Sequence, residues 1–538
     1  MLSVAPTTDV RPQVDLRRLD WRYLLPRPGT GEFRQLVLLG GDEALADSIV
    51  SLGIARSVSL RLPEKPTADA IIALHPSQPA PEHLARSLAP GGVFYTERVR
   101  SATPAALARR RFRSAFERAG LASRVYWARP DFYPCQMVIP LDVPGALRWY
   151  LATLYAPSSR VQSALGQGVR ALAQLDARPV LPASRYVVTG RAGRPQSGED
   201  LVYAHPALPM RGDLYPLIIG AGNATNRVVV APFSAQGQRP EAIVKLARHP
   251  ALNARVEAEQ LALARLHATL DEPLRQTLPQ PIGQKMWGDL AVGVETCAPG
   301  RPLSAISRTA LPAEHITHLR TVADWLTRFH CAAQLRDGIW TATDIQEWVD
   351  MPLAEYEAIF GVTAGERRLF EEVRRRAHTL AGAALPVVWN HWGFEDRNLF
   401  LDGPTLTVID WEGGSPGPPL FDLLYFVLRW YESGRRRQGR AAPLSAFSDL
   451  FLGRNGGQIG AAARDAIERY MAALHLDRRF FPVLLALLWV HRALGRVKAD
   501  GSLRMRGGDA RVGNSYVDYV SLLADNVERL FDGGEWPR

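Results

Sequence analysis

Short apolar runs and amphipathic stretches alternate along the first 150 residues of the chain. The apolar runs lie at residues 36–39, 58–62, 70–74 and 93–95. One amphipathic stretch follows the first run as far as Leu52, and another ends at Leu88. Glycine pairs at 40–41 and 91–92 mark short turns. Strands that alternate with helices through short turns usually pair in parallel, so this pattern predicts an α/β domain with a doubly wound sheet over residues 30–150.

The pattern changes twice after this region. Residues 151–184 have a helical and then a loop-like pattern that ends near Pro179 and Pro182, which predicts a helical linker. From residue 185 the apolar runs indicate antiparallel strands, and from about residue 300 most of the pattern is helical. We therefore expect an α+β unit of two lobes, a small lobe over residues 185–300 and a large lobe over residues 301–538.

The composition is that of a globular protein. The chain has 538 residues, of which 47% are hydrophobic and 22% are charged, and this length predicts two or three domains. Cys135, Cys297 and Cys331 are far apart and odd in number, so we expect a reducing compartment and neither a disulfide framework nor a zinc cluster. No apolar run follows the charges of the N-terminus, and the stretch Phe480–Val490 is too short to cross a bilayer. These features predict a cytoplasmic protein without a signal peptide or membrane span.

The net charge of +10 would favour an anionic partner. The basic runs are short and lie at residues 109–111, 374–376 and 435–437. No aromatic residues are interleaved with them, so a solvated surface is favoured over a nucleic-acid groove. We expect no nucleic-acid partner.

A glycine-containing turn at residues 220–226 lies between two β-rich runs. Backbone N–H groups at Gly220 and Gly222 could bind phosphates in such a turn. An ordinary hairpin turn has the same composition, and both interpretations stay open.

Lys245 ends the apolar strand that follows. A lysine at this place can pair with phosphates, although a strand-end lysine can also simply extend into water. The next helix, residues 253–267, places Glu259 on the same side as its core-facing leucines. A carboxylate on an inward face needs a buried partner, which we expect to be Lys245. Glu257 is the competing candidate, and the helical periodicity favours Glu259.

Residues 390–410 hold the strongest chemical signal. Asp402-Gly403 is a turn between two apolar runs, so residues 399–409 form a short hairpin. The hairpin brings Asn398 and Asp410 to the same open end. An amide oxygen beside a carboxylate suits a magnesium ion that also holds phosphate oxygens, so we predict a metal site there.

Part of the N-terminal domain resembles class I S-adenosylmethionine-dependent methyltransferases, which have a Rossmann-like fold. The resemblance lies in the late motifs at residues 68–72, 84–88 and 89–94. The cofactor motifs depart from that family. Gly40-Gly41-Asp42 stands in place of a Gly-x-Gly loop, and Arg61 lies where an acid would hold the ribose hydroxyls. We therefore expect a degenerate domain with a structural role, and binding of S-adenosylmethionine is doubtful.

From Tyr186 to the C-terminus the chain resembles the aminoglycoside phosphotransferase and choline kinase group, which has a protein-kinase-like fold. The resemblance lies in Lys245, Glu259, His391, Phe394, Asn398 and the segments 409–412 and 418–426. It implies binding of ATP and Mg²⁺ and transfer of a phosphoryl group to an alcohol. The segment 292–296, which includes Glu295, falls where this group contacts adenine through its backbone.

The resemblance also implies individual roles. Lys245 would pair with the phosphates and Glu259 would orient it. Asn398 and Asp410 would hold magnesium, and Asp422 would brace the loop. These assignments come from the family and extend the roles that spacing alone suggests.

The family's loop reads His-Gly-Asp-Phe, and its aspartate accepts the proton of the acceptor hydroxyl. In this chain that position is Gly393, so His391, Glu395 and Asp396 are the candidate catalytic side chains. Loss of a general base commonly lowers the rate about a hundred- to ten-thousand-fold. We expect an ATP- and Mg²⁺-dependent phosphotransferase acting on a small hydroxylated molecule or glycan. A nucleotide-binding scaffold without fast transfer is the alternative, and an active methyltransferase is the third hypothesis.

Overall fold

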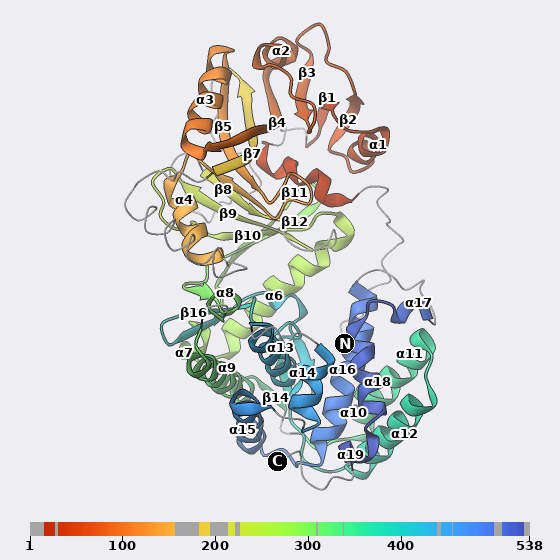
Figure 1. The fold of residues 1–538 in the computed structure, drawn as a ribbon. Coiled ribbons are helices and arrows are strands. Elements are labelled where there is room, and N and C mark those ends of the chain that lie inside the picture. Colours follow the sequence, from red (N-terminus) through yellow and green to blue (C-terminus); the bar gives the residue numbers. More distant parts are fainter. Residues whose placement is uncertain are drawn as a thin grey trace. The chain divides into compact units, whose positions relative to one another are not determined.

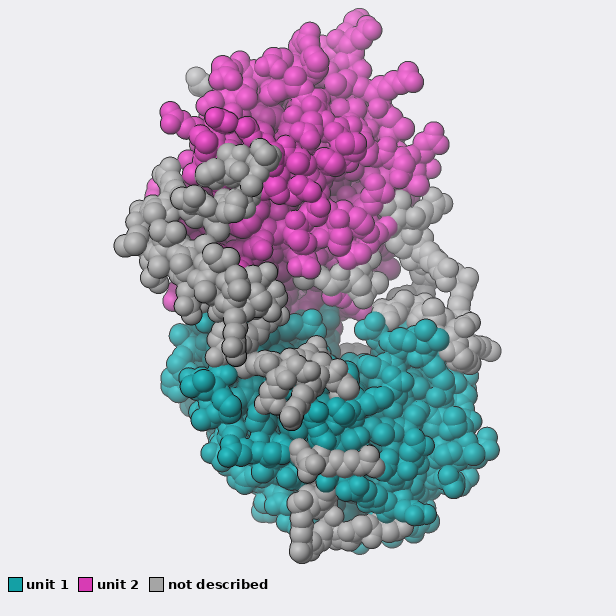
Figure 2. All heavy atoms as spheres, in the orientation of Figure 1, with its two compact units in different colours: residues 1, 262–278, 298–538 teal, residues 2–261, 279–297 magenta. Residues whose placement is uncertain are grey.

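The computed structural model forms two compact units (Figure 2). Unit 1 comprises residues 1, 262–278 and 298–538, and unit 2 comprises residues 2–261 and 279–297. The structure describes residues 15–26, 31–155, 182–193, 214–220, 226–307, 310–336, 338–437, 443–453, 456–499 and 508–531. Residues 156–181 of the predicted linker lie outside this part. The predicted domain boundaries at residues 150, 184 and 300 stay predictions. The last segment of unit 1 begins at residue 298, close to the predicted boundary at residue 300.

Unit 2 contains one twelve-stranded sheet (Figure 1), with the strand order β11-β12-β10-β9-β8-β6-β5-β7-β4-β3-β1-β2. The strands are β1 (Phe33–Leu39), β2 (Ala55–Ser59), β3 (Ala68–Ala73), β4 (Leu88–Pro104), β5 (Leu121–Arg129), β6 (Met137–Pro140), β7 (Pro182–Ala192), β8 (Leu214–Ile219), β9 (Val228–Ser234), β10 (Ile243–Leu246), β11 (Pro281–Trp287) and β12 (Leu290–Glu295). The N-terminal strands and those expected for the small lobe thus belong to the same sheet.

The first four strands pair in parallel, as the alternating pattern predicts: β1 pairs with β2 and β3, and β3 with β4. Leu36, Leu38 and Ile72 pack in one core, whereas Val37 and Ile71 pack in another. Alternate side chains point to opposite faces of a strand, so both faces of this part of the sheet are covered. A relation of this region to Rossmann-like methyltransferases stays a prediction.

The second strand lies earlier than its apolar run suggested. β2 covers residues 55–59 instead of 58–62, because its parallel register pairs Phe33 with Ala55 and Val37 with Ser59. Arg61 therefore lies beyond the strand end and is exposed.

Short helices and helical turns complete unit 2. They are η1 (Leu16–Leu24), α1 (Glu43–Ser51), α2 (Pro81–Ser87), α3 (Ala105–Arg118), α4 (Pro144–Trp149), η2 (Tyr150–Leu154) and η4 (Pro250–Leu252). Polar contacts attach η1 to the antiparallel end of the sheet. Arg22 Nη2 donates to the carbonyl of Arg248 at 2.6 Å, and the Arg248 guanidinium donates two bonds, of 2.9 and 2.7 Å, to Asp20. Arg248 is fully buried, so this bidentate pair places a compensated charge inside unit 2.

The helix α6 (Asn253–Thr269) belongs to both units, because its residues up to 261 fall in unit 2 and the rest in unit 1. Unit 1 is mostly helical. Its helices are α7 (Glu272–Arg275), α8 (Leu303–Ser307), α9 (Pro312–Ala332), α10 (Ala342–Ile345), η5 (Gln346–Asp350), α11 (Met351–Phe360), α12 (Ala364–Thr379), η6 (Trp411–Gly413), α13 (Phe421–Arg437), α14 (Pro443–Phe451), α15 (Gly457–Ala473), α16 (Phe480–Ala499), α17 (Gly508–Arg511), α18 (Ser515–Ala524) and α19 (Val527–Phe531).

Two small sheets accompany these helices. One has the order β13-β16-β17, and the other has the order β14-β15-β18. Their strands are β13 (Arg301–Pro302), β14 (Gln334–Arg336), β15 (Val387–Asn390), β16 (Leu399–Asp402), β17 (Thr405–Val408) and β18 (Ser415–Gly417).

The helix α16 extends beyond the apolar run Phe480–Val490. Within the described residues, the segment Phe480–Lys498 is the one helical stretch long and apolar enough to cross a membrane. However, 72% of its apolar 18-residue stretch is buried inside the protein. Leu484, Leu487 and Trp489 are fully buried in the core of unit 1. These contacts are those of a core helix.

Candidate functional site

Four buried or half-buried charged side chains form a cluster in unit 2. Lys245 Nζ lies 2.5 Å from Glu259 Oε1 and 2.8 Å from Glu295 Oε1. The other oxygen of Glu259 pairs with Arg227 Nη1. Glu259 therefore orients two cations at once, one through each oxygen. Lys245, Glu259 and Glu295 are each at most 4% exposed, so solvent screens these interactions little.

The pairing distinguishes the two candidate glutamates on α6. Glu259 is buried against Lys245, whereas Glu257 is exposed. The inward periodicity of the helix thus identified the partner of Lys245, and the role of the pair in nucleotide binding stays a prediction.

Glu295 has a side-chain position that the sequence did not suggest. Its segment was expected to act through its backbone, yet its carboxylate contacts Lys245. In the register of β10 and β12, Lys245 lies opposite Gly293. Glu295 is two residues further along β12, so it is a diagonal neighbour of Lys245. Burial raises the pKa of Glu295 to about 7; the charge of Lys245 opposes this shift and that of Glu259 adds to it.

The glycine turn is described only in part. Gly220 N–H donates to the carbonyl of Gln136 at 3.0 Å, so this group is used within the protein and is not directed at a phosphate. The Gly220 carbonyl accepts a bond from Arg248. Gly222 lies outside the described residues.

The predicted hairpin is present in unit 1. β16 and β17 pair in antiparallel register, with Leu399 opposite Val408 and Asp402 opposite Thr405. Ile409 N–H donates to the Asn398 carbonyl at 2.9 Å, which extends the pairing to the open end where Asp410 follows.

The donor groups at this open end fit a hard cation such as Mg²⁺. Asn398 Nδ2 donates to the Gly393 carbonyl at 2.9 Å, so the amide nitrogen is engaged and its oxygen remains the side-chain acceptor. Asp410 has φ 73° and ψ 56°, a left-handed conformation that costs a non-glycine residue roughly 1–3 kcal/mol and that often occurs at functional sites. Within the described residues no group of three or more His, Cys, Asp or Glu side chains is placed to bind a metal. A cation at Asn398 and Asp410 would therefore need further oxygens from its ligand.

Asp422 braces the loop that precedes the hairpin. Its carboxylate accepts the backbone N–H groups of His391 at 2.5 Å and Trp392 at 2.9 Å. Burial raises the pKa of Asp422, and these hydrogen bonds oppose the shift. The bracing role that the family resemblance implies is thus visible in the hydrogen bonds.

Both ring nitrogens of His391 face backbone groups. Gly393 N–H donates to Nδ1 at 3.1 Å, which leaves Nε2 to donate to the Ile409 carbonyl at 2.8 Å. His391 therefore joins the loop to the hairpin as a neutral imidazole protonated at Nε2. In this arrangement it positions the loop.

The two candidate carboxylates after Gly393 have different surroundings. Glu395 Oε1 pairs with Arg397 at 2.6 Å, and its Oε2 accepts a bond from Tyr425 at 3.5 Å. Both of its oxygens thus contact donors in unit 1. Asp396 is half-buried, and its carbonyl accepts the N–H of Ser304 at 2.9 Å.

Trp392 and Gly393 both differ from the family's loop. Trp392 stands where the family has glycine, and Gly393 stands where the family has aspartate. Trp392 has a left-handed φ of 60° where the family has glycine, and Asp422 and Arg492 hold its N–H and its carbonyl. Gly393 has no left-handed φ. A Cβ at Gly393 would lie 3.4 Å from the His391 ring and 3.6 Å from Asn398 Nδ2, which are ordinary contact distances.

Comparison with known proteins adds to this geometry. Residues 219–451 match the phosphotransferase enzyme family. The matched segment covers less than half of the 538 residues, and it includes Lys245, Glu259, Glu295 and the hairpin with Asn398 and Asp410. The kinase-like prediction for this part of the chain is therefore supported. No curated protein matches the chain.

Several solved structures are similar to the chain. One is an amicoumacin kinase in complex with AMP-PNP, Ca²⁺ and amicoumacin, with 11% identity, 61% of this chain and 90% of that chain covered and a TM-score of 0.35. Another is a choline/ethanolamine kinase family protein from Mesorhizobium loti, with 15% identity, 62% and 95% coverage and a TM-score of 0.33. A third is an aminoglycoside phosphotransferase from Streptomyces rimosus in complex with ADP and streptomycin, with 15% identity, 49% and 89% coverage and a TM-score of 0.30. These identities and TM-scores are low.

Proposed function

We propose that this chain is an ATP- and Mg²⁺-dependent phosphotransferase that transfers a phosphoryl group to a hydroxyl of a small molecule or glycan. The observation that carries the proposal is the buried pair of Lys245 and Glu259 inside the segment that matches the phosphotransferase family. Phosphoryl transfer depends mainly on positioning and charge stabilisation, which are tasks for such groups. We place the reaction in the cytoplasm, because three widely separated cysteines fit a reducing compartment.

Each group has a distinct role in this proposal. Lys245 binds phosphate oxygens, and Glu259 keeps its ammonium in place. Asn398 and Asp410 supply the oxygen ligands of Mg²⁺, which neutralises phosphate charge when bound. His391 and Asp422 hold the loop that carries Gly393, and Glu395 or Asp396 receives the proton of the acceptor hydroxyl less efficiently than a carboxylate at position 393 would.

A nucleotide-binding scaffold is the second candidate function. Gly393 favours it, because no carboxylate occupies the position where the family has its aspartate. The contacts of Glu395 with Arg397 and Tyr425 also favour it, because they hold the nearest glutamate within its own unit. The enzyme and the scaffold would use the same residues to bind nucleotide and metal. They differ in whether bound ATP is turned over.

One titration series tests Mg²⁺-dependent ATP binding, which both candidate functions require. ATP affinity is measured by calorimetry with and without Mg²⁺ for the wild type, Asp410→Ala and Asp402→Ala. Asp402 is the matched control, because it lies exposed at the turn of the same hairpin. We expect Asp410→Ala to lose the Mg²⁺-dependent part of the affinity and Asp402→Ala to keep it. Equal metal dependence in all three proteins would refute the metal assignment.

A second measurement separates enzyme from scaffold. ADP formation is followed for the wild type, Glu395→Gln and Asp396→Asn under conditions in which ATP binding is saturated. Turnover that falls by about a hundredfold or more in one variant identifies the proton acceptor and supports the enzyme. Saturated binding without turnover in the wild type supports the scaffold.

A further inference from the structure

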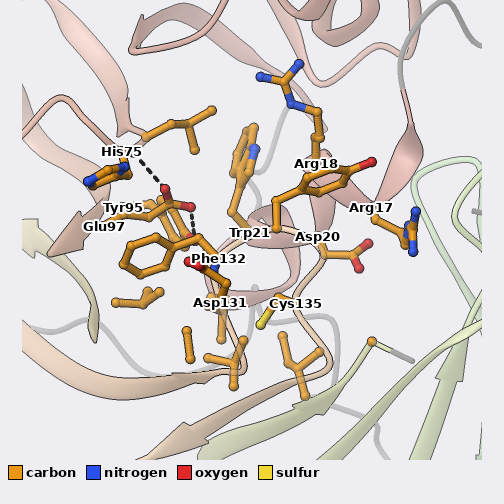
Figure 3. A pocket seen from close by; sticks show the side chains of 18 of the residues that line it. Arg17, Arg18, Asp20, Trp21, His75, Tyr95, Glu97, Asp131, Phe132 and Cys135 are labelled. Atoms are coloured by element: carbon orange, nitrogen blue, oxygen red, sulfur yellow. Dashed lines mark hydrogen bonds between the residues drawn. The ribbon is translucent and has the colours of Figure 1, made fainter. Parts of the chain in front are cut away.

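A cavity of about 590 Å³ lies in unit 2, and its lining does not include Lys245, Glu259 or Glu295 (Figure 3). Gly40 and Leu74, directly after the ends of β1 and β3, line it, and β4 contributes Tyr95 and Glu97. Open α/β sheets bind ligands outside the carboxyl ends of their strands. The volume is also within the range of small-molecule sites. The place and size are thus those of a ligand site.

The cavity lining includes Arg17, Arg18 and five carboxylates. The carboxylates belong to Asp15, Asp20, Asp42, Glu97 and Asp131. Four of the five pair with an arginine: Asp15 with Arg17, Asp20 with Arg248, Asp42 with Arg18 and Asp131 with Arg185. Glu97 is the fifth, and within the described residues no cation lies within ion-pair distance of it.

The contacts of Glu97 are with neutral donors (Figure 3). Its Oε2 accepts the backbone N–H of His75 at 2.7 Å, and its Oε1 accepts the Tyr95 hydroxyl at 3.1 Å. The residue is 7% exposed. A buried carboxylate without a counter-ion is unfavourable when ionised, so a cation beside it would be stabilised.

The cavity also has aromatic walls. Trp21, Tyr95 and Phe132 line it, and the rings of Trp21 and Tyr95 lie 6.4 Å apart. Aromatic faces attract cations.

We propose that this cavity binds a small organic ammonium ion, with Glu97 as its counter-ion and the aromatic rings of Trp21, Tyr95 and Phe132 around it. The site needs no nucleotide and goes beyond the phosphotransferase activity. Binding adds no covalent step.

The charge on Glu97 depends on pH. Burial raises its pKa to about 7, and its hydrogen bonds with His75 and Tyr95 oppose the shift. The titratable and charged groups that face Glu97 are Tyr95 on the same strand, His75 after β3, Arg18 on η1, and Asp131 and Cys135 in the segment between β5 and β6. The carboxylate forms as the pH rises through about 7, so ammonium binding strengthens in that direction. The pH effect is compared with that in Glu97→Gln, which lacks this carboxylate.

The test uses two probes of the same shape and the full chain. 2-Phenoxyethylamine carries an ammonium group and an ether oxygen, and 2-phenoxyethanol has a hydroxyl in place of the ammonium. Calorimetry at about pH 8 should show the amine binding at least about tenfold more tightly, and this preference should shrink at about pH 6. Glu97→Gln should remove most of the preference, whereas Asp131→Asn, which changes an acid paired with Arg185, should keep it.

Three outcomes would overturn the proposal. They are equal affinities for the two probes at the higher pH, a full preference retained in Glu97→Gln, and no binding of either probe at about 10 mM, which is weaker than ordinary ligand sites. If Glu97→Gln fails to fold, the wild-type comparison of the two probes at the two pH values still decides. Nucleotide binding is measured in the same samples, so failure of this site is distinguishable from failure of the proposed phosphotransferase function.

Discussion

Lys245 Nζ lies 2.8 Å from Glu295 Oε1, and both side chains are buried. Burial raises the pKa of Glu295 to about 7, well above the value of an exposed glutamate, and Lys245 offsets part of this shift. The folded protein therefore holds a proton that the unfolded chain releases at lower pH. Its free energy of unfolding should fall as the pH rises from about 4.5 to about 7.

Glu295→Gln removes this titration. We expect the variant to gain stability relative to the wild type as the pH is raised from about 5 to about 8, because only the wild type carries the penalty of an ionised buried glutamate. Thermal unfolding midpoints at the two pH values measure the effect. Glu257→Gln is the control, because Glu257 is exposed and its change should leave the pH dependence unaltered. A stability difference between Glu295→Gln and the wild type that is the same at both pH values would contradict the prediction.

The pair of Lys245 and Glu259 should act as one unit in nucleotide binding. Lys245→Met and Glu259→Gln should each weaken ATP binding, and the double variant should be little weaker than the worse single variant, because residues in direct contact are not additive. Calorimetric dissociation constants for the four proteins give the coupling energy. Arg227 also pairs with Glu259, so Glu259→Gln is expected to have the larger effect on stability. Fully additive losses would show that the two residues act separately.

Local patterns made the hairpin and the Lys245–Glu259 pair predictable. Asp402-Gly403 specifies a turn between two apolar runs, and the hairpin register then fixes where Asn398 and Asp410 lie. The inward stripe of α6 contains Glu259 and excludes Glu257 for the same kind of local reason. Each of these features depends on residues close together in the sequence.

Non-local pairing explains what the sequence did not predict. The position of Glu295 beside Lys245 depends on the register of β10 with β12, strands about fifty residues apart in the chain. The insertion of β7 between β4 and β5 likewise joins segments that no local pattern connects. The buried Arg248 and its bidentate contact with Asp20 link residues 228 positions apart. Such pairings follow from the whole fold, and periodicity in one segment carries no information about them.

The N-terminal domain should not bind S-adenosylmethionine tightly. β2 ends at Ser59 without an acid, and the turn after β1 is closely packed, because a Cβ on Gly40 would lie 2.3 Å from the Leu74 carbonyl oxygen. We expect no change in the thermal unfolding midpoint with about millimolar cofactor. ATP with Mg²⁺ serves as the positive control in the same assay. A shift of several degrees with the cofactor would refute the expectation and favour the methyltransferase hypothesis.

Gly393→Asp tests whether the phosphotransferase lacks only its general base. The backbone at Gly393 is not left-handed, and the new Cβ would meet the His391 ring at 3.4 Å, so the loop can accept the side chain. The carboxylate would then stand where the family has its aspartate. We expect ATP turnover, even with water as the acceptor, to rise at least about tenfold above the wild type, below the full effect of a general base.

Gly393→Asn is the matched control for this gain, because asparagine has a similar shape and no charge. A gain with aspartate and none with asparagine supports an enzyme that lacks its base, since the hydrogen bonds of Asp422 to His391 and Trp392 hold the loop in every variant. Turnover of the wild type at a rate typical of kinases would contradict the prediction and assign the proton to Glu395 or Asp396. Intact ATP binding without turnover in any of the three proteins would instead identify a scaffold, because the added carboxylate would then have no reaction to assist.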